Sequence, residues 1–110
     1  MDKYEKVYAR DGYRCIYCGR FLLTDFESWA SLHTDHLVPS VAGGDETSEN
    51  LVTSCPTCNL LKHDFRASFP YEPNRRDEYL KEAREYIGRK RSAWLPDFFE
   101  AIRQWKDGEK

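Results

Sequence analysis

The chain has 110 residues, a length typical of one domain, and its 40% hydrophobic and 15% aromatic residues are enough for a small core. A net charge of −2 excludes the strongly basic surface of many nucleic-acid-binding proteins, so local patches or bound metal would have to attract a phosphodiester partner. No apolar run approaches the ~20 residues of a membrane span, and no apolar signal segment opens the chain. We therefore expect a cytoplasmic protein with no membrane partner.

The first half of the chain predicts one helix followed by two strands. Tyr4, Val7 and Tyr8 recur at helical spacing and indicate one apolar helix face. Residues 21–31 are ambiguous, because an apolar run is followed there by residues that could cap a short turn. The expected elements are a helix over residues 3–10, a strand over residues 32–38, a loop over residues 40–49 and a strand over residues 51–54.

The second half of the chain predicts helices. Pro56 suits the first turn of a helix because it has no N–H to leave unpaired. Asn74 can cap a later helix, and we expect the aromatic side chains that follow Pro96 to lie in the core. The expected elements are a helix from Pro56 to about residue 65, a connector over residues 67–74, a helix over residues 74–89 and a last helix that begins at Pro96.

All four cysteines of the chain occur in two Cys-x-x-Cys motifs. This double spacing is typical of a closed, tetrahedral zinc site in which four thiolates hold a structural ion. Two disulfides in a secreted binding domain are the alternative, although a reducing compartment favours metal. The four predicted zinc ligands are Cys15, Cys18, Cys55 and Cys58.

Polar residues that could perform chemistry lie between and just after these motifs. Asp35 and His36 are adjacent in an expected strand, and Asn59 and His63 are one helical turn apart and share a helix face. A histidine with an ordinary pKa of ~6.5 can accept a proton from water at neutral pH, and a divalent ion can act as a Lewis acid on a phosphodiester. We therefore expect a second, open metal site. Oxygen ligands with an imidazole suit Mg²⁺ or Mn²⁺.

The order of these motifs resembles the HNH endonuclease family in its four-cysteine zinc form. The resemblance covers residues 10 to about 66, and the last 44 residues lie outside it. It implies an α+β fold with a ββα-metal core, in which two strands, a loop and a helix surround one catalytic ion. The motifs that carry it are Arg10-Asp11-Gly12-Tyr13-Arg14-Cys15, Asp35-His36-Leu37-Val38-Pro39, Gly43-Gly44, Glu49-Asn50-Leu51-Val52 and Cys55-Pro56-Thr57-Cys58-Asn59.

The resemblance also implies a role for each polar residue of the motifs. His36 would be the general base that activates water, and Asp35 would be a ligand of the catalytic ion. Asn50 would hydrogen-bond across the loop and orient His36. Asn59 stands where relatives carry His or Asn as a metal ligand, and His63 matches a second helix ligand of some relatives, although it could also be a helix-surface histidine.

We divide the chain into an HNH core over residues 1–66 and a helical extension over residues 67–110 that packs on the same domain. Basic residues near the motifs, and one basic run in the extension, could contact DNA phosphates or could simply be solvated. They are Arg14, Arg20, Lys62 and Arg66, and the run Arg89, Lys90 and Arg91.

The function that this reading predicts is metal-dependent hydrolysis of phosphodiester bonds in DNA. The alternative is a non-catalytic zinc-binding module that interacts with DNA or with a protein. Such a module would be expected to have lost Asp35, His36 or the helix ligand, and the sequence retains all of them.

Overall fold

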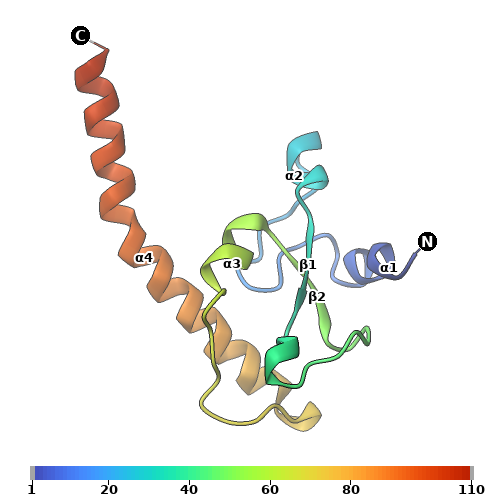
Figure 1. Ribbon diagram of the computed structural model, residues 1–110. Coiled ribbons are helices and arrows are strands. Elements are labelled where there is room, and N and C mark those ends of the chain that lie inside the picture. Colours follow the sequence, from blue (N-terminus) through green and yellow to red (C-terminus); the bar gives the residue numbers. More distant parts are fainter. Residues whose placement is uncertain (1, 110) are drawn as a thin grey trace.

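The computed structural model describes residues 2–109, in which a two-stranded antiparallel sheet is surrounded by helices (Figure 1). This α+β arrangement confirms the predicted fold class. The helices are α1 Lys3–Arg10, α2 Phe26–Ala30, α3 Pro56–Leu61 and α4 Arg76–Gly108, the strands are β1 His33–His36 and β2 Leu51–Ser54, and short 3-10 turns cover Ser40–Ala42 and Pro73–Arg75.

The first helix is closed by a capping box and is fastened to the sheet. Asp2 accepts a hydrogen bond from the Glu5 N–H at 2.9 Å, and the Glu5 side chain accepts one from the Asp2 N–H. Arg10, at the other end of the helix, donates to the carbonyl of Ser48 and to that of Leu51, both at 2.7 Å. The helix therefore braces the loop that leads into β2.

The hairpin pairs His33 with Ser54 and His36 with Leu51. Every residue of β2 is buried, whereas β1 is half-buried and partly exposed. The first strand is shorter than the predicted 32–38, because the Val38 N–H is bound by the side chain of Asn50 instead of by a partner strand. The hairpin thus opens into a loop after Leu37, whose N–H still bonds to the Asn50 carbonyl at 2.7 Å.

The third helix ends at Leu61, earlier than the predicted residue 65. The His63 N–H bonds to the carbonyl of Leu60 and the Phe65 N–H to that of Lys62, so the chain tightens into turns. These turns bury Phe65, whose ring lies 5.7 Å from that of Tyr79 in an edge-on contact. The tightened turns thereby place Phe65 in the core, where it packs against the last helix.

The last helix runs without interruption from Arg76 to Gly108, so the prediction of two separate helices is wrong. Gly88 keeps a negative φ and does not end the helix. Pro96 removes one N–H donor but lies inside the helix, since the residues between it and Gly88 are mostly good helix formers.

Only the first half of α4 packs on the body. Its buried residues Tyr79, Leu80, Ala83 and Ile87 join the core, whereas the large apolar residues from Trp94 onward are exposed. The radius of gyration of 16.1 Å exceeds the ~13 Å of a compact chain of this size, because the end of the helix projects from the body (Figure 1). The prediction that these late aromatic residues belong to the core is wrong.

Within the described residues, no helix combines the length and the apolarity that a membrane crossing requires.

Candidate active site and metal centre

The four cysteines converge on one point at the edge of the sheet. Cys55 caps the N-terminus of α3, and Ile16 of the first motif bonds to the Thr53 carbonyl of β2 at 2.9 Å, which brings the two motifs together. All four sulfur atoms lie within 4.8 Å of one another, and the Cys18 and Cys55 sulfurs are 3.9 Å apart. A tetrahedron of zinc–sulfur bonds of ~2.3 Å has edges of about 3.8 Å. The cluster therefore fits a zinc ion.

Negative charge is shared unequally within this cluster. Hydrogen bonds with Cys55 and Cys58 lower the pKa of Cys15, and the same bonds to Cys15 raise the pKa of both partners. A guanidinium N–H of Arg91 lies 3.3 Å from the Cys58 sulfur. Arg91, which we predicted as a possible phosphate contact, lies beside thiols that carry negative charge when they bind metal.

Asp35 and His36 border one cleft of about 240 Å³ at the end of β1. Neighbouring strand residues normally face opposite sides of a sheet. Both can reach the same cleft here because His36 is the last residue of β1, where the chain leaves the ladder. The residues that line the cleft are Asp35, His36, Pro39, Ser40, Asn59, Lys62, His63 and Phe65.

Asp35 is held by two side chains that meet at the same carboxylate oxygen. The Tyr17 hydroxyl donates to Oδ2, and the Lys62 ammonium lies 2.9 Å from it. Burial, and then the charge of Asp35, raises the pKa of Tyr17 well above its ordinary value, so its hydroxyl stays a donor. Among the described residues, no hydrogen bond is made to Oδ1 of Asp35, which is thus available to an ion.

Lys62 is buried, with only 6% of its surface exposed. Its ammonium also donates to the main-chain carbonyl of His36 at 2.9 Å and lies over the ring of Tyr17. We had placed Lys62 among the residues that could contact phosphate, and the structure shows it buried at the wall of the cleft that Asp35 and His36 also border. Nothing in the local sequence marked this role, because Asp35 and Tyr17 reach Lys62 only through the fold.

His36 has an acidic partner that sequence reasoning missed. Its Nε2 atom makes a short hydrogen bond with Glu46, which lies in the loop between the strands. This hydrogen bond is the main reason that the pKa of Glu46 lies below its ordinary value, so the carboxylate is ionised at neutral pH. Lys3 lies 3.7 Å from the other oxygen of Glu46. No motif marked Glu46, because the loop position that faces His36 depends on the fold.

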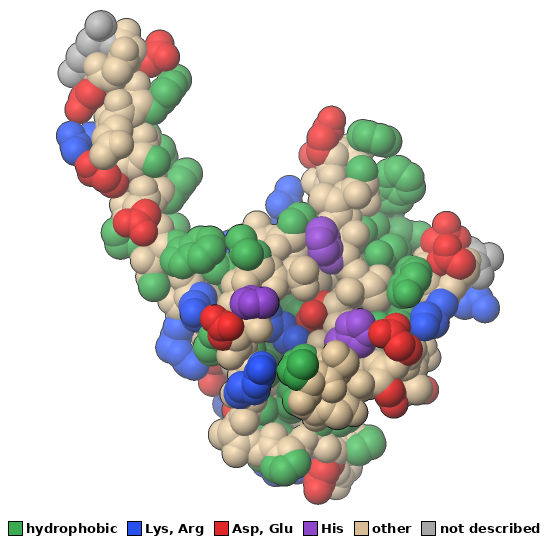
Figure 2. All heavy atoms as spheres, viewed as in Figure 1, with side chains coloured by type: hydrophobic (Ala, Val, Ile, Leu, Met, Phe, Trp, Pro, Cys, Tyr) green, Lys and Arg blue, Asp and Glu red, His purple; other side chains and the backbone are tan. Residues whose placement is uncertain are grey.

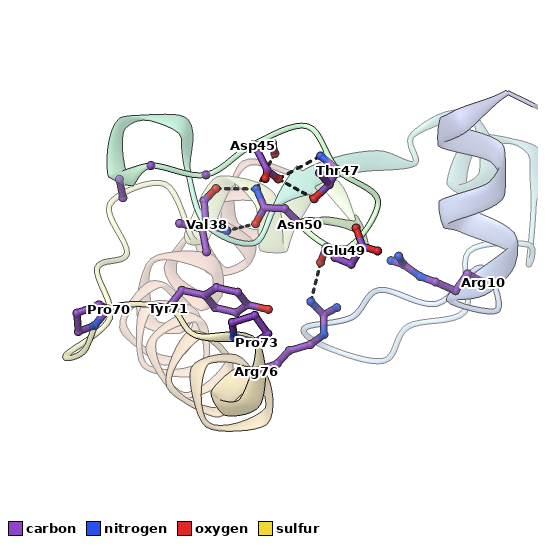
Figure 3. Close-up of a pocket in the computed structure, with 13 residues that line it drawn as sticks. Arg10, Val38, Asp45, Thr47, Glu49, Asn50, Pro70, Tyr71, Pro73 and Arg76 are labelled. Atoms are coloured by element: carbon purple, nitrogen blue, oxygen red, sulfur yellow. Dashed lines mark hydrogen bonds between the residues drawn. The ribbon is translucent and has the colours of Figure 1, made fainter.

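Asn50 ties the two sides of the loop together, as Figure 3 shows. Its side chain accepts from the Val38 N–H at 2.8 Å and donates to the carbonyls of Val38 and Asp45 at 3.0 and 2.8 Å. A Cβ atom at Gly44 would lie 1.7 Å from the Val38 carbonyl oxygen, so this loop requires glycine there. The bonds fix the loop that follows His36.

A larger pocket of about 730 Å³ lies on the other side of this loop (Figure 3). It is lined in part by Asn50, Tyr71 and Arg76. None of the predicted metal ligands borders it, so it is separate from the cleft that holds Asp35 and His36.

The two helix residues predicted as ligands both border the cleft but differ in exposure. Asn59 is half-buried, whereas the side chain of His63 is 83% exposed and approaches only Asp64, at 3.9 Å. Among residues 2–109, the cysteines form the only group of three or more Cys, His, Asp or Glu side chains close enough to share an ion. The residues predicted as ligands of a catalytic ion therefore border one cleft without forming a closed cluster.

The other predicted DNA contacts lie on the surface at separate places. Arg14 stacks on Phe21, Arg20 bonds to Ser28, and Arg66 donates to its neighbouring carbonyl. The basic residues 89–91 of α4 point to different sides of the helix, since successive helical residues point ~100° apart. The face in Figure 2 shows histidine side chains with basic and acidic groups among them.

A protein-family model matches the segment that contains this site. Residues 15–65 match the family model described as HNH endonuclease. This segment is an HNH endonuclease-family domain. It contains both strands, α3, the four cysteines and every residue that borders the cleft, and membership of this family supports nuclease chemistry.

The chain is also similar to part of a restriction enzyme. The type IV methyl-directed restriction enzyme EcoKMcrA of Escherichia coli (strain K12) is 30% identical to the chain over 77 residues. The match covers 57% of this chain and 27% of that enzyme. The chain thus spans about a quarter of the relative's length.

Proposed function

We propose that the chain is a metal-dependent endonuclease that hydrolyses phosphodiester bonds in DNA. The observation that carries the proposal is that Asp35, His36 and Asn59 border one cleft of an HNH domain. Restriction of DNA by the Escherichia coli relative supports DNA as the substrate. Recognition of methylated DNA does not follow, because the match covers 27% of that enzyme.

His36 is the proposed general base. Glu46 engages its Nε2 atom, so a neutral imidazole with its proton on Nε2 leaves Nδ1 as the proton acceptor. Water loses its proton to this nitrogen and attacks phosphorus in line. The bond to the 3′ oxygen then breaks, and this oxygen takes a proton from solvent, which leaves a 5′-phosphate and a 3′-hydroxyl, as in HNH relatives. Asn50 holds the loop behind His36 and limits movement of the ring.

The residues of the cleft fit a divalent ion, and we propose Mg²⁺ or Mn²⁺. Asp35 offers the Oδ1 atom, Asn59 offers its amide oxygen, and His63 can turn from its exposed position to offer a ring nitrogen. Such ligands suit hard divalent ions. When bound, the ion supplies Lewis-acid stabilisation of the phosphorane and of the leaving oxygen. A zinc ion held by the four cysteines is proposed to be structural.

The direct test is incubation of the zinc-loaded protein with supercoiled plasmid and with single-stranded DNA. We expect cleavage with Mg²⁺ or Mn²⁺ and none with EDTA added just before the reaction. Cleavage that persists in EDTA would contradict the metal-dependent mechanism. A folded, zinc-loaded protein that binds DNA but cuts with no ion would favour the non-catalytic zinc module.

Lys62 is proposed to position Asp35, and Lys62→Met should therefore destabilise the domain. Removal of one partner of a buried ion pair typically costs about 3–5 kcal/mol, because the other charge stays buried without compensation. Lys62→Arg is the matched control and should retain most of the stability. The measurement is urea denaturation of both variants with zinc bound.

A divalent ion at Asp35 would replace the missing positive charge of Lys62→Met. Added Mn²⁺ should therefore stabilise Lys62→Met more than the unaltered protein. Equal stability of Lys62→Met and the unaltered protein, with or without Mn²⁺, would show that the lysine does not hold Asp35.

A further inference from the structure

The projecting end of α4 carries an apolar stripe with no partner among the described residues. The stripe comprises Trp94, Leu95, Phe98, Phe99, Ile102 and Trp105, which recur at helical spacing on one side. Five of its side chains are between 42% and 63% exposed. Hydrophobic side chains also follow the projecting helix in Figure 2.

The stripe continues the face by which α4 packs on the body. Leu80, Ile87 and Trp94 are seven residues apart, so they share one side of the helix. The first two are buried in the core, and the third lies beyond its edge. The body thus ends before the apolar face does, and a second surface is needed to cover the remainder.

The exposed area matches what a small dimer requires. An aromatic side chain contributes roughly 150–250 Å². At the observed exposures the stripe leaves on the order of 500 Å² uncovered per chain, which is more than a monomer usually exposes without a function. Two such stripes would bury about 1,000 Å² in total, near the lower limit of a specific interface.

We propose that a second copy of this chain covers the stripe through an antiparallel pairing of the two α4 ends. The stripe has the a and d spacing of a heptad at Leu95, Phe98, Ile102 and Trp105. An antiparallel pair centred on residue 100 packs Leu95 against the partner's Trp105 and Phe98 against the partner's Ile102. Every layer then combines one aromatic with one aliphatic side chain.

Charge and space also favour the antiparallel orientation. Residues 89–91 carry three positive charges, whereas residues 106–110 carry two negative and two positive ones. A parallel pair would place the two basic runs side by side, whereas the antiparallel pair separates them and brings Glu109 next to the partner's Arg91. In this register residue 109 of one helix reaches residue 91 of the other, where Arg91 already contacts the body. The two bodies therefore lie at opposite ends of the helix pair and do not collide.

We infer the dimer from the apolar stripe, independently of any nuclease activity. The advantage of a dimer, which is two active clefts in one complex, rests on the proposed nuclease function. Each chain has one proposed active cleft, so cleavage of both strands of a duplex takes two separate cleavage events. A two-fold pair supplies both in one encounter.

The test is analytical ultracentrifugation of the zinc-loaded protein over a range of concentrations. We expect the mass to rise from the 13.0 kDa of one chain to twice that value. Phe98→Glu should remain a monomer with unchanged helix content by circular dichroism. Gln104→Glu adds the same charge to the same helix outside the stripe and should dimerise normally. An unaltered protein that stays monomeric at several hundred micromolar, or one whose mass rises beyond two chains, would overturn the proposal.

The orientation can be tested by zero-length carbodiimide cross-linking and peptide mass spectrometry. Lys90 and Glu109 lie 19 residues apart on one helix, about 28 Å, so a link between them must join two chains. Such a link is expected in the antiparallel dimer, and its absence from a cross-linked dimer would exclude that orientation.

A dimer that cuts no DNA would contradict the proposed function alone, and a cutting monomer would contradict the dimer alone.

Discussion

Replacement of His36 by alanine should reduce DNA cleavage by roughly 10²–10⁴-fold while leaving zinc content and DNA binding unchanged. The substitution removes the proton acceptor but retains Asp35, Asn59 and the cysteine cluster. Because the ring is half-exposed at the end of β1, its loss should cost little stability. The measurement is single-turnover cleavage of plasmid DNA under saturating metal.

His33→Ala is the matched control for this variant. His33 lies in the same strand, is exposed and bonds through its ring only to the Ser31 carbonyl. It should cut at the rate of the unaltered protein. If His36→Ala also cuts at that rate, in a preparation free of contaminating nuclease, His36 is not the base.

The pH dependence of the unaltered protein offers a second check on the base. The hydrogen bond with His36 lowers the pKa of Glu46, so Glu46 stays ionised when the pH falls from neutral to mildly acidic values. Protonation of Glu46 should therefore not limit the rate there. Activity that rises with pH in the unaltered protein but not in the residual rate of His36→Ala would assign the pH dependence to the general base.

Cys55→Ser should lose one zinc ion per chain and much of the folded structure. Cys55 caps α3 and belongs to the cluster that joins the first motif to β2, so metal binding and folding of this region are coupled. Elemental analysis and thermal unfolding followed by circular dichroism would measure both effects. Prolonged dialysis of the unaltered protein against a strong chelator should have the same result.

Thr57→Ala is the control for the zinc prediction, since Thr57 lies between two cysteines of one motif and is exposed. It should retain zinc and melt like the unaltered protein. A protein purified without chelator that contains no zinc, or a Cys55→Ser variant that melts normally, would exclude a structural zinc ion.

Local patterns in the sequence determined the centre of the fold. Helical spacing at Tyr4, Val7 and Tyr8 predicted α1, and the strand–loop–strand–helix order around the cysteines was found close to its expected bounds. These elements were predictable because turn, capping and metal-ligand signals act over a few residues. The convergence of the cysteines was likewise predictable, since two Cys-x-x-Cys motifs have few other uses.

The environment of a charged side chain could not be predicted where it depends on distant segments. Lys62 was expected to contact phosphate or solvent near the motifs, and in the structure its ammonium meets Asp35 and Tyr17. The run that begins at Arg89 suggested one basic patch, but the helix directs Arg91 toward the cysteines. Charge in a sequence indicates which groups must be compensated, and the fold decides which partner compensates them.

The sequence by itself determined the ββα order, the cysteine cluster and the adjacent Asp35 and His36, because each depends on local spacing. Only the tertiary structure decided that Glu46 engages His36 and that Lys62 holds Asp35, because loop closure brings these groups together. It also decided that α4 continues past Pro96 into solvent. Amphipathic spacing specifies an apolar helix face, but whether that face finds a partner depends on how far the body extends beneath it.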